Sequence, residues 1–85
     1  MKTKLTVTIF ENCGEATTID KYYNEHLSLS VGTGVIIGGR DSVIGAVFFN
    51  TQTDIIQYLC KHIDVTKDNY GDFLIKLAME GWKFE

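Results

Sequence analysis

The stretch SVGTGVIIGGRD, residues 30–41, decides between two folds, because it holds four of the chain's eight glycines beside an aliphatic run. A nucleotide-binding loop needs Gly-x-Gly-x-x-Gly directly between a strand and a helix, where backbone amides and the helix N-terminus meet the phosphate. Here the spacing is Gly32-x-Gly34-x-x-x-Gly38, one residue too long, and no Walker-type lysine follows. The next segment has strand character as well. The stretch therefore predicts two strands that fold back on each other.

This predicted hairpin turns at Gly38-Gly39 or at Gly39-Arg40, because either pair can supply the positive φ angles of a tight turn. If Gly38 pairs with Asp41, then Gly34 lies opposite Gly45. One face of the hairpin then carries a smooth strip of small residues: Ser28, Ser30, Gly32, Gly34 and Gly45. Glycines gathered within strands mark the close approach of another backbone or a ligand. The strip predicts either tight packing by the chain's own helix or a flat patch that docks a partner.

Other segments also have strand patterns. Residues 3–10 alternate between polar and apolar side chains, with Leu5, Val7 and Ile9 on one face, which predicts a half-exposed strand. Residues 17–26 fit either a strand or a helix, and the short connection before them favours a strand that pairs back on the first. Residues 27–37 alternate again. Residues 43–50 are apolar on both sides, which is typical of a mid-sheet strand with both faces covered.

Two helices are predicted at the C-terminal end. The first is capped by Thr51 or Thr53, and its apolar side comprises Ile55, Ile56, Leu59, Cys60 and Ile63. The second is capped by Asp68 or Asn69 and ends at Gly81, and its apolar stripe is Tyr70, Phe73, Leu74 and Leu77. The sequence thus predicts an α+β fold: an antiparallel sheet of three or four strands, built as hairpins, followed by two helices packed on one sheet face.

Composition narrows the possible functions. The chain has 85 residues, which predicts a single domain over residues 1–85. Its formal net charge is −3, with 8 Lys+Arg against 11 Asp+Glu, which argues against direct binding to nucleic acid. No segment approaches the roughly 20 apolar residues of a membrane span. Two cysteines and an N-terminus without a signal-peptide pattern predict a cytoplasmic protein.

Metal and catalytic chemistry receive no support from the motifs. Zinc ligands could be drawn from Cys13, His26, Cys60 and His62, but no Cys-x-x-Cys or His-x₃-His pair occurs. Residues 64–72 resemble the start of a twelve-residue calcium-binding loop in the spacing of their acidic and hydroxyl side chains. Asn69 occupies position six, where glycine is required, and Ile75 occupies position twelve, where a bidentate glutamate is required. Neither cysteine has an evident adjacent base, and Gly-x-Ser-x-Gly is absent. We therefore predict no catalytic residue, no metal ligand and no cofactor.

The aromatic residues suggest a surface instead. Tyrosine and tryptophan are enriched at interfaces, and an arginine at a hairpin tip is a plausible contact. Ordinary structural roles are the alternative, since tyrosines pair across strands and Trp82 could close the core after Gly81. The predicted interaction surface comprises Tyr22, Tyr23, Ser30, Gly32, Gly34, Arg40, Gly45 and Trp82.

The predicted function is therefore non-enzymatic protein–protein binding, as a homodimer or with another protein. Small size, mild acidity and the lack of catalytic motifs suit an inhibitor or regulator of the kind that phages and mobile elements encode, for example against a host defence enzyme. The alternative is a protein that sequesters a small molecule or nucleotide. Its pocket would lie between the sheet and the helices and be lined by Tyr22, Tyr23, Phe48 and Trp82.

Overall fold

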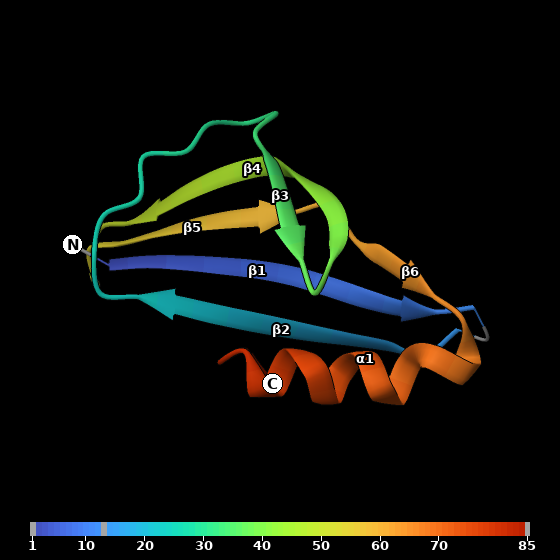
Figure 1. The fold of residues 1–85 in the computed structure, drawn as a ribbon. Helices are drawn as coiled ribbons and strands as arrows, with labels where there is room; N and C mark the ends of the chain where they lie inside the picture. The colour runs from blue at the N-terminus through green and yellow to red at the C-terminus, as the bar shows by residue number, and fades with distance from the viewer. Residues whose placement is uncertain (1, 13, 85) are drawn as a thin grey trace.

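The computed structural model describes residues 2–12 and 14–84, which form a curled seven-stranded sheet and one helix (Figure 1). The strands are β1 (Lys2–Glu11), β2 (Ala16–Tyr23), β3 (Gly34–Ile37), β4 (Arg40–Asn50), β5 (Ile55–Cys60), β6 (Ile63–Val65) and β7 (Lys83–Phe84). The helix is α1 (Lys67–Met79). The strand order is β3-β4-β5-β1-β2-β7, and β6 pairs with β1. The sheet is mixed, because β1 runs antiparallel to β2 but parallel to β5 and β6.

The predicted antiparallel sheet of three or four strands with two C-terminal helices is wrong, because the expected first helix is a turn followed by β5 and β6. Asn50 Oδ1 accepts hydrogen bonds from the backbone N–H groups of Gln52 (2.9 Å) and Thr53 (3.3 Å). Such an Asx turn ends β4 and reverses the chain, so neither threonine caps a helix. The sequence IIQYLC is also rich in strand-forming residues, and β5 lies between β4 and β1.

The antiparallel pairing of β1 with β2 confirms the strand interpretation for residues 17–23, whereas residues 24–26 lie beyond the end of β2. The predicted alternation of residues 3–10 is confirmed as well, since Leu5, Val7 and Ile9 are all buried on one face. These three side chains form the base of the hydrophobic core, and the polar residues between them lie on the opposite face.

The predicted hairpin is confirmed for β3 and β4, and its turn is Gly38-Gly39, the first of the two predicted pairs, whereas residues 27–33 of the predicted strand lie outside β3. The register that places Gly38 opposite Asp41 is wrong. Gly38 and Gly39 form a two-residue loop, with φ angles of 59° and 83°, and Ile37 pairs with Arg40. Two consecutive positive φ angles place the turn at these residues, so Gly34 lies opposite Val43 and not opposite Gly45. Gly45 instead falls at an irregularity of the β4–β5 pairing, between Ile44 and Ala46. The smooth strip of small residues therefore does not form.

The hairpin and α1 cover the same face of the sheet, on which the core lies (Figure 1). Phe73 and Leu77 of α1 are buried, and the hairpin tip presses directly on them. A Cβ atom at Gly38 would lie 2.7 Å from Phe73 Cε1 and 3.0 Å from Leu77 Cδ2. The glycines predicted a place where two parts of the molecule approach closely. That place is Gly38, whose backbone lies against side chains of the chain's own helix α1.

The second predicted helix is confirmed as α1, with a shifted start and the expected end. The N-cap is Thr66, two or three residues before the predicted Asp68 or Asn69, and Asn69 Nδ2 donates to Thr66 Oγ1 at 2.8 Å. At the C-terminus Gly81 has a φ of 97°, and the N–H of Trp82 donates to Leu77 O at 3.1 Å. This is a Schellman motif, which glycine favours because it tolerates the left-handed conformation. In residues 2–12 and 14–84, no helix has the length and apolar character needed to cross a lipid bilayer.

Candidate functional site on the open face of the sheet

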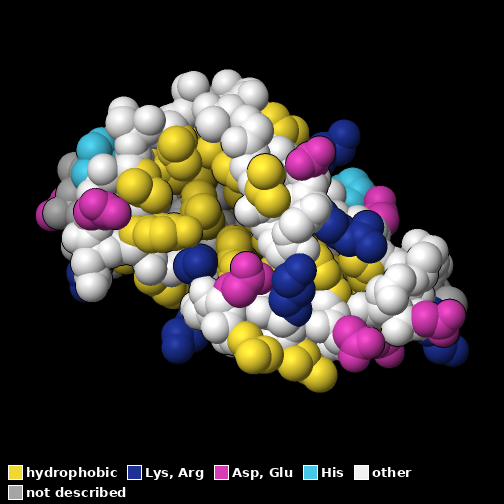
Figure 2. Space-filling view, viewed as in Figure 1, with side chains coloured by type: hydrophobic (Ala, Val, Ile, Leu, Met, Phe, Trp, Pro, Cys, Tyr) yellow, Lys and Arg dark blue, Asp and Glu magenta, His cyan; other side chains and the backbone are white. Residues whose placement is uncertain are grey.

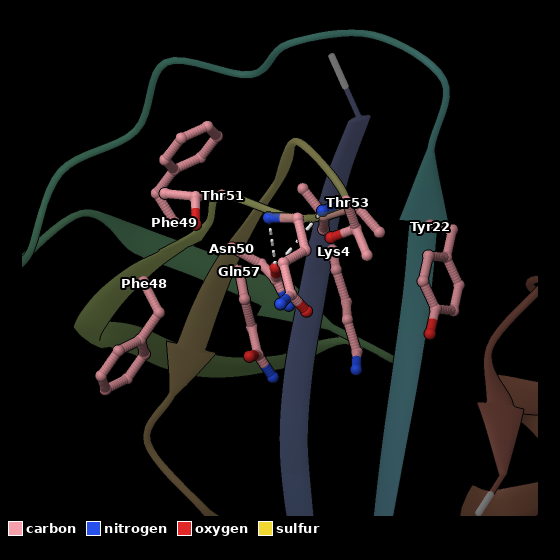
Figure 3. Close-up of a pocket in the computed structure, with 10 residues that line it drawn as sticks. Lys4, Tyr22, Phe48, Phe49, Asn50, Thr51, Thr53 and Gln57 are labelled. Atoms are coloured by element: carbon pink, nitrogen blue, oxygen red, sulfur yellow. Dashed lines mark hydrogen bonds between the residues drawn. The ribbon is translucent and has the colours of Figure 1, made fainter.

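Four side chains from four neighbouring strands align across the sheet face opposite α1. Phe48 of β4 pairs with Gln57 of β5, Gln57 with Lys4 of β1, and Lys4 with Tyr22 of β2. Residues directly opposite each other in paired strands point to the same face. The four therefore form one transverse row, which we call the open-face row (Figure 3). Its ends are aromatic and exposed, since Phe48 is 54% and Tyr22 is 51% exposed.

A hydrogen-bonded network lies beside the open-face row. Gln57 Nε2 donates to Thr6 Oγ1 at 3.0 Å, and the Thr6 hydroxyl donates to Asp20 Oδ1 at 2.6 Å. The ammonium of Lys4 lies 3.9 Å from Asp20 Oδ2 and 5.7 Å from the centre of the Tyr22 ring. Asp20 is buried, so these partners take the place of water around its side-chain oxygens. The network fixes Lys4 and Gln57 between the two aromatic ends.

The open-face row forms part of a groove of about 690 Å³. The turn after β4 closes one end of this groove, where Asn50 holds the backbone of Gln52 and Thr53 (Figure 3). The lining residues are Lys4, Tyr22, Phe48, Phe49, Asn50, Thr51, Gln52, Thr53, Ile55 and Gln57. The rings of Tyr22 and Phe48, amides, hydroxyls and one ammonium thus face a single hollow, and Phe49, which shares the face of its pair Ile56, borders it. In the described part of the chain, no group of three or more His, Cys, Asp or Glu side chains could hold a metal ion.

The aromatic members of the predicted interaction surface are separated by the structure. Tyr22 belongs to the open-face row. Tyr23 lies on the opposite face, half-buried against the core, because neighbouring strand residues point to opposite sides. Trp82 is buried in the core directly after α1, and Lys21 lies 6.0 Å from its ring. Trp82 therefore closes the core, as the alternative to an interface role predicted.

Arg40 and the small residues have local structural roles. The guanidinium of Arg40 lies 5.6 Å from the centre of the Phe73 ring and donates to Asp64 O at 3.3 Å, which ties the hairpin to α1 and β6. Ser30 and Gly32 lie in the loop before β3, Gly34 begins β3, and Gly45 lies in β4. The eight predicted residues therefore do not form one continuous surface.

The expected pocket between sheet and helices does not form from its four predicted residues. Tyr23 and Trp82 belong to the core side, whereas Tyr22 and Phe48 lie on the open face. A smaller hollow does lie between the hairpin and α1, lined by Gly38, Arg40, Asn69, Asp72, Phe73 and Lys76. The larger groove, on the other side of the sheet, is the better candidate site.

The predicted interaction surface omitted Phe48 and Gln57, and Phe48 was assigned only to the alternative pocket between sheet and helices. Residues 43–50 were expected to be covered on both faces, but Val47, Phe48 and Phe49 are 40%, 54% and 49% exposed. The signal was available in the chain length, since 85 residues provide too few elements to cover both faces of a wide sheet. An apolar strand in so small a domain therefore indicates an exposed apolar surface as readily as a buried one.

Comparisons with models of known protein families, with curated proteins and with solved structures found no match to this chain. The function is therefore inferred from the geometry of the described residues.

Proposed function

We propose that this is a small non-enzymatic binding protein whose groove on the open face of the sheet receives a segment of another protein. The observation that carries this proposal is the open-face row, in which two exposed aromatic rings flank hydrogen-bonding side chains held by a buried network. Aromatic residues supply most of the binding energy at many interfaces, and polar groups between them fix orientation. A regulator or inhibitor would need no more than such a surface.

The chemistry of the row suits a peptide segment in particular. Gln57 retains hydrogen-bonding capacity beyond its bond to Thr6, because its amide has two donor hydrogens and an acceptor oxygen. A peptide backbone offers matching carbonyl and N–H groups. Phe48 and Tyr22, at the two ends, would contact apolar side chains of the same segment. The network through Asp20 holds Lys4 in place before binding, which lowers the entropy cost of association.

The test is capture of a partner with matched variants. A tagged chain should retain one stoichiometric protein from a lysate of its source, and Tyr22→Ala should reduce the recovered amount by about tenfold or more, as loss of an aromatic anchor does. Phe84→Ala removes a ring that is 46% exposed on β7, outside the groove, and should leave recovery unchanged. Recovery that is insensitive to Tyr22→Ala, with both variants folded by circular dichroism, would contradict the proposal.

A small-molecule ligand is the second candidate, favoured by the volume of the groove. About 690 Å³ lies within the range of roughly 300–1,000 Å³ typical of ligand pockets. A thermal-shift screen with nucleotides and common metabolites would then show a rise in melting temperature without any protein partner, and Tyr22→Ala would abolish it. No shift with any compound, together with capture of a protein, favours the first candidate.

The cytoplasm is the proposed location. The Cys60 thiol is free in the described part of the chain and half-buried. A reducing compartment keeps such a thiol free.

A further inference from the structure

The outer edge of β4 is paired along only part of its length. β3 pairs with residues 40–43, and the loop before β3 continues as far as Ile44, whose backbone exchanges hydrogen bonds with Gly32 N (2.8 Å) and Thr33 O (3.0 Å). Residues 46–50 pair with β5 on their inner side. No residue of the described ranges forms a backbone pair with their outer side. In Figure 1, β3 flanks only the part of β4 near the hairpin turn, and the segment that joins β2 to β3 passes beyond the outer side of the remainder without pairing with it.

Within residues 46–50 this free edge lacks a charge or a proline that would oppose pairing, and the β4–β5 irregularity between Ile44 and Ala46 lies just before it. Natural edge strands carry lysine, proline or inward-pointing charges, or are covered by another element. Residues 46–50, AVFFN, contain no charge and no proline, and Val47, Phe48 and Phe49 are all at least 40% exposed. Figure 2 shows hydrophobic side chains at the surface of this part of the sheet. The exposed backbone groups and apolar side chains together are suited to an added strand.

We infer that the added strand is residues 46–50 of a second copy, paired antiparallel about a two-fold axis at Phe48. The free stretch is bounded by the Ile44 pairing at one end and by the turn at Asn50 at the other. Full pairing of two such stretches places Phe48 opposite Phe48 of the partner, and Ala46 opposite Asn50. The two sheets then become continuous, in the isologous arrangement of most homodimers.

About this axis each apolar residue from Val47 to Phe49 meets another apolar residue, which suits a second copy of this edge. Phe48 meets its equivalent on the open face. On the other face Val47 of each copy meets Phe49 of the other, because paired residues share a face. Three cross-strand apolar pairs therefore cover six exposed side chains. No like charges lie opposite each other, since the stretch is uncharged.

The first test is the oligomeric state across a concentration series, by light scattering or sedimentation. The unaltered chain should show a monomer–dimer equilibrium. Phe48→Lys should weaken the dimer by about tenfold or more, because it removes an aromatic pair and places two like charges opposite each other. Ile75→Lys changes an apolar residue of α1 that is 61% exposed and far from this edge in the fold, and should leave the equilibrium unchanged.

A cysteine pair tests the register independently of Phe48→Lys. Phe48→Cys should form a disulfide-linked dimer on mild oxidation, because directly opposed Cα atoms lie about 4.5–5.5 Å apart, within disulfide range. Phe49→Cys should do so much more slowly, since its equivalent lies diagonally across the pair at about 7–8 Å. Both variants keep the same native cysteines and so control for each other.

A chain that remains monomeric at millimolar concentration would overturn the inference, and so would equal crosslinking of the two cysteine variants. An intact dimer in Phe48→Lys would also overturn it. Binding of another protein to the groove is a separate result, because Tyr22→Ala tests the groove and leaves the β4 edge unchanged. Failure of either proposal can therefore be recognised without the other.

Discussion

The Thr6 hydroxyl donates to Asp20 Oδ1 across 2.6 Å, and both residues are buried although they lie on the sheet face opposite α1. Lys4 is the other close partner of this carboxylate, at 3.9 Å. The shorter Thr6 bond is a charge-assisted hydrogen bond, which is stronger than a bond between neutral groups. It therefore supports both the fold and the placement of Gln57 in the groove.

Thr6→Val, which keeps the shape of the side chain, should lower the free energy of unfolding by about 2–3 kcal/mol, because the buried carboxylate loses its strongest partner. Urea denaturation measures this loss. Thr8→Val is the matched control. Its hydroxyl lies 3.1 Å from that of Thr18, a neutral and partly buried partner, so the cost should be about 0.5–1.5 kcal/mol. Equal losses in the two variants would show that the carboxylate does not depend on Thr6.

Gly38→Ala should destabilise the protein more than Gly39→Ala, although both residues have positive φ angles. The backbone strain costs about 1 kcal/mol in each variant. Only at Gly38 does the new methyl group collide with a packed side chain, Phe73, which adds about 1–3 kcal/mol. At Gly39 the nearest atom is Lys76 Nζ, at 3.8 Å. Thermal melts compare the melting temperatures of the two variants. Equal melting temperatures would contradict the packing described for the hairpin tip.

Tyr58→Phe should loosen the segment between β2 and β3. The Tyr58 hydroxyl donates to Leu27 O at 2.6 Å and accepts from Leu29 N at 3.0 Å, and the residue is 2% exposed. Loss of both bonds should cost about 1–3 kcal/mol and should speed amide hydrogen exchange at Leu29. Tyr22→Phe removes an exposed hydroxyl and should change stability by no more than about 0.5 kcal/mol. Unchanged exchange at Leu29 would contradict the anchoring role.

Burial raises the pKa of the Cys60 thiol, so the folded protein disfavours the reactive thiolate. In a Cys13→Ser background, alkylation of Cys60 near pH 8 should be slower in the folded protein than in urea, with a pH midpoint above the ordinary value. Because the folded pKa is raised, the associated stability is complete below the unfolded pKa and is lost as pH rises through the folded pKa. Equally fast alkylation in both states would contradict the burial.

Local features of the sequence determined much of the fold. Alternation in residues 3–10 predicts the buried face of β1, since side chains of a strand alternate between its two faces. The helical spacing of Tyr70, Phe73 and Leu77 predicts the buried side of α1. Positive φ angles at Gly38 and Gly81 are properties of glycine itself. Each of these depends on residues that lie close together in the chain.

The tertiary structure alone decided the remainder. Residues 55–60 suit a helix or a strand, and they form β5 because β1 and β4 are available on both sides of it. The row of Phe48, Gln57, Lys4 and Tyr22 joins four strands whose register no local pattern specifies. Strand pairing is a contact between distant parts of the chain, and one residue of slippage exchanges the two faces. For that reason, which apolar side chains were covered and which stayed exposed became visible only in the folded sheet.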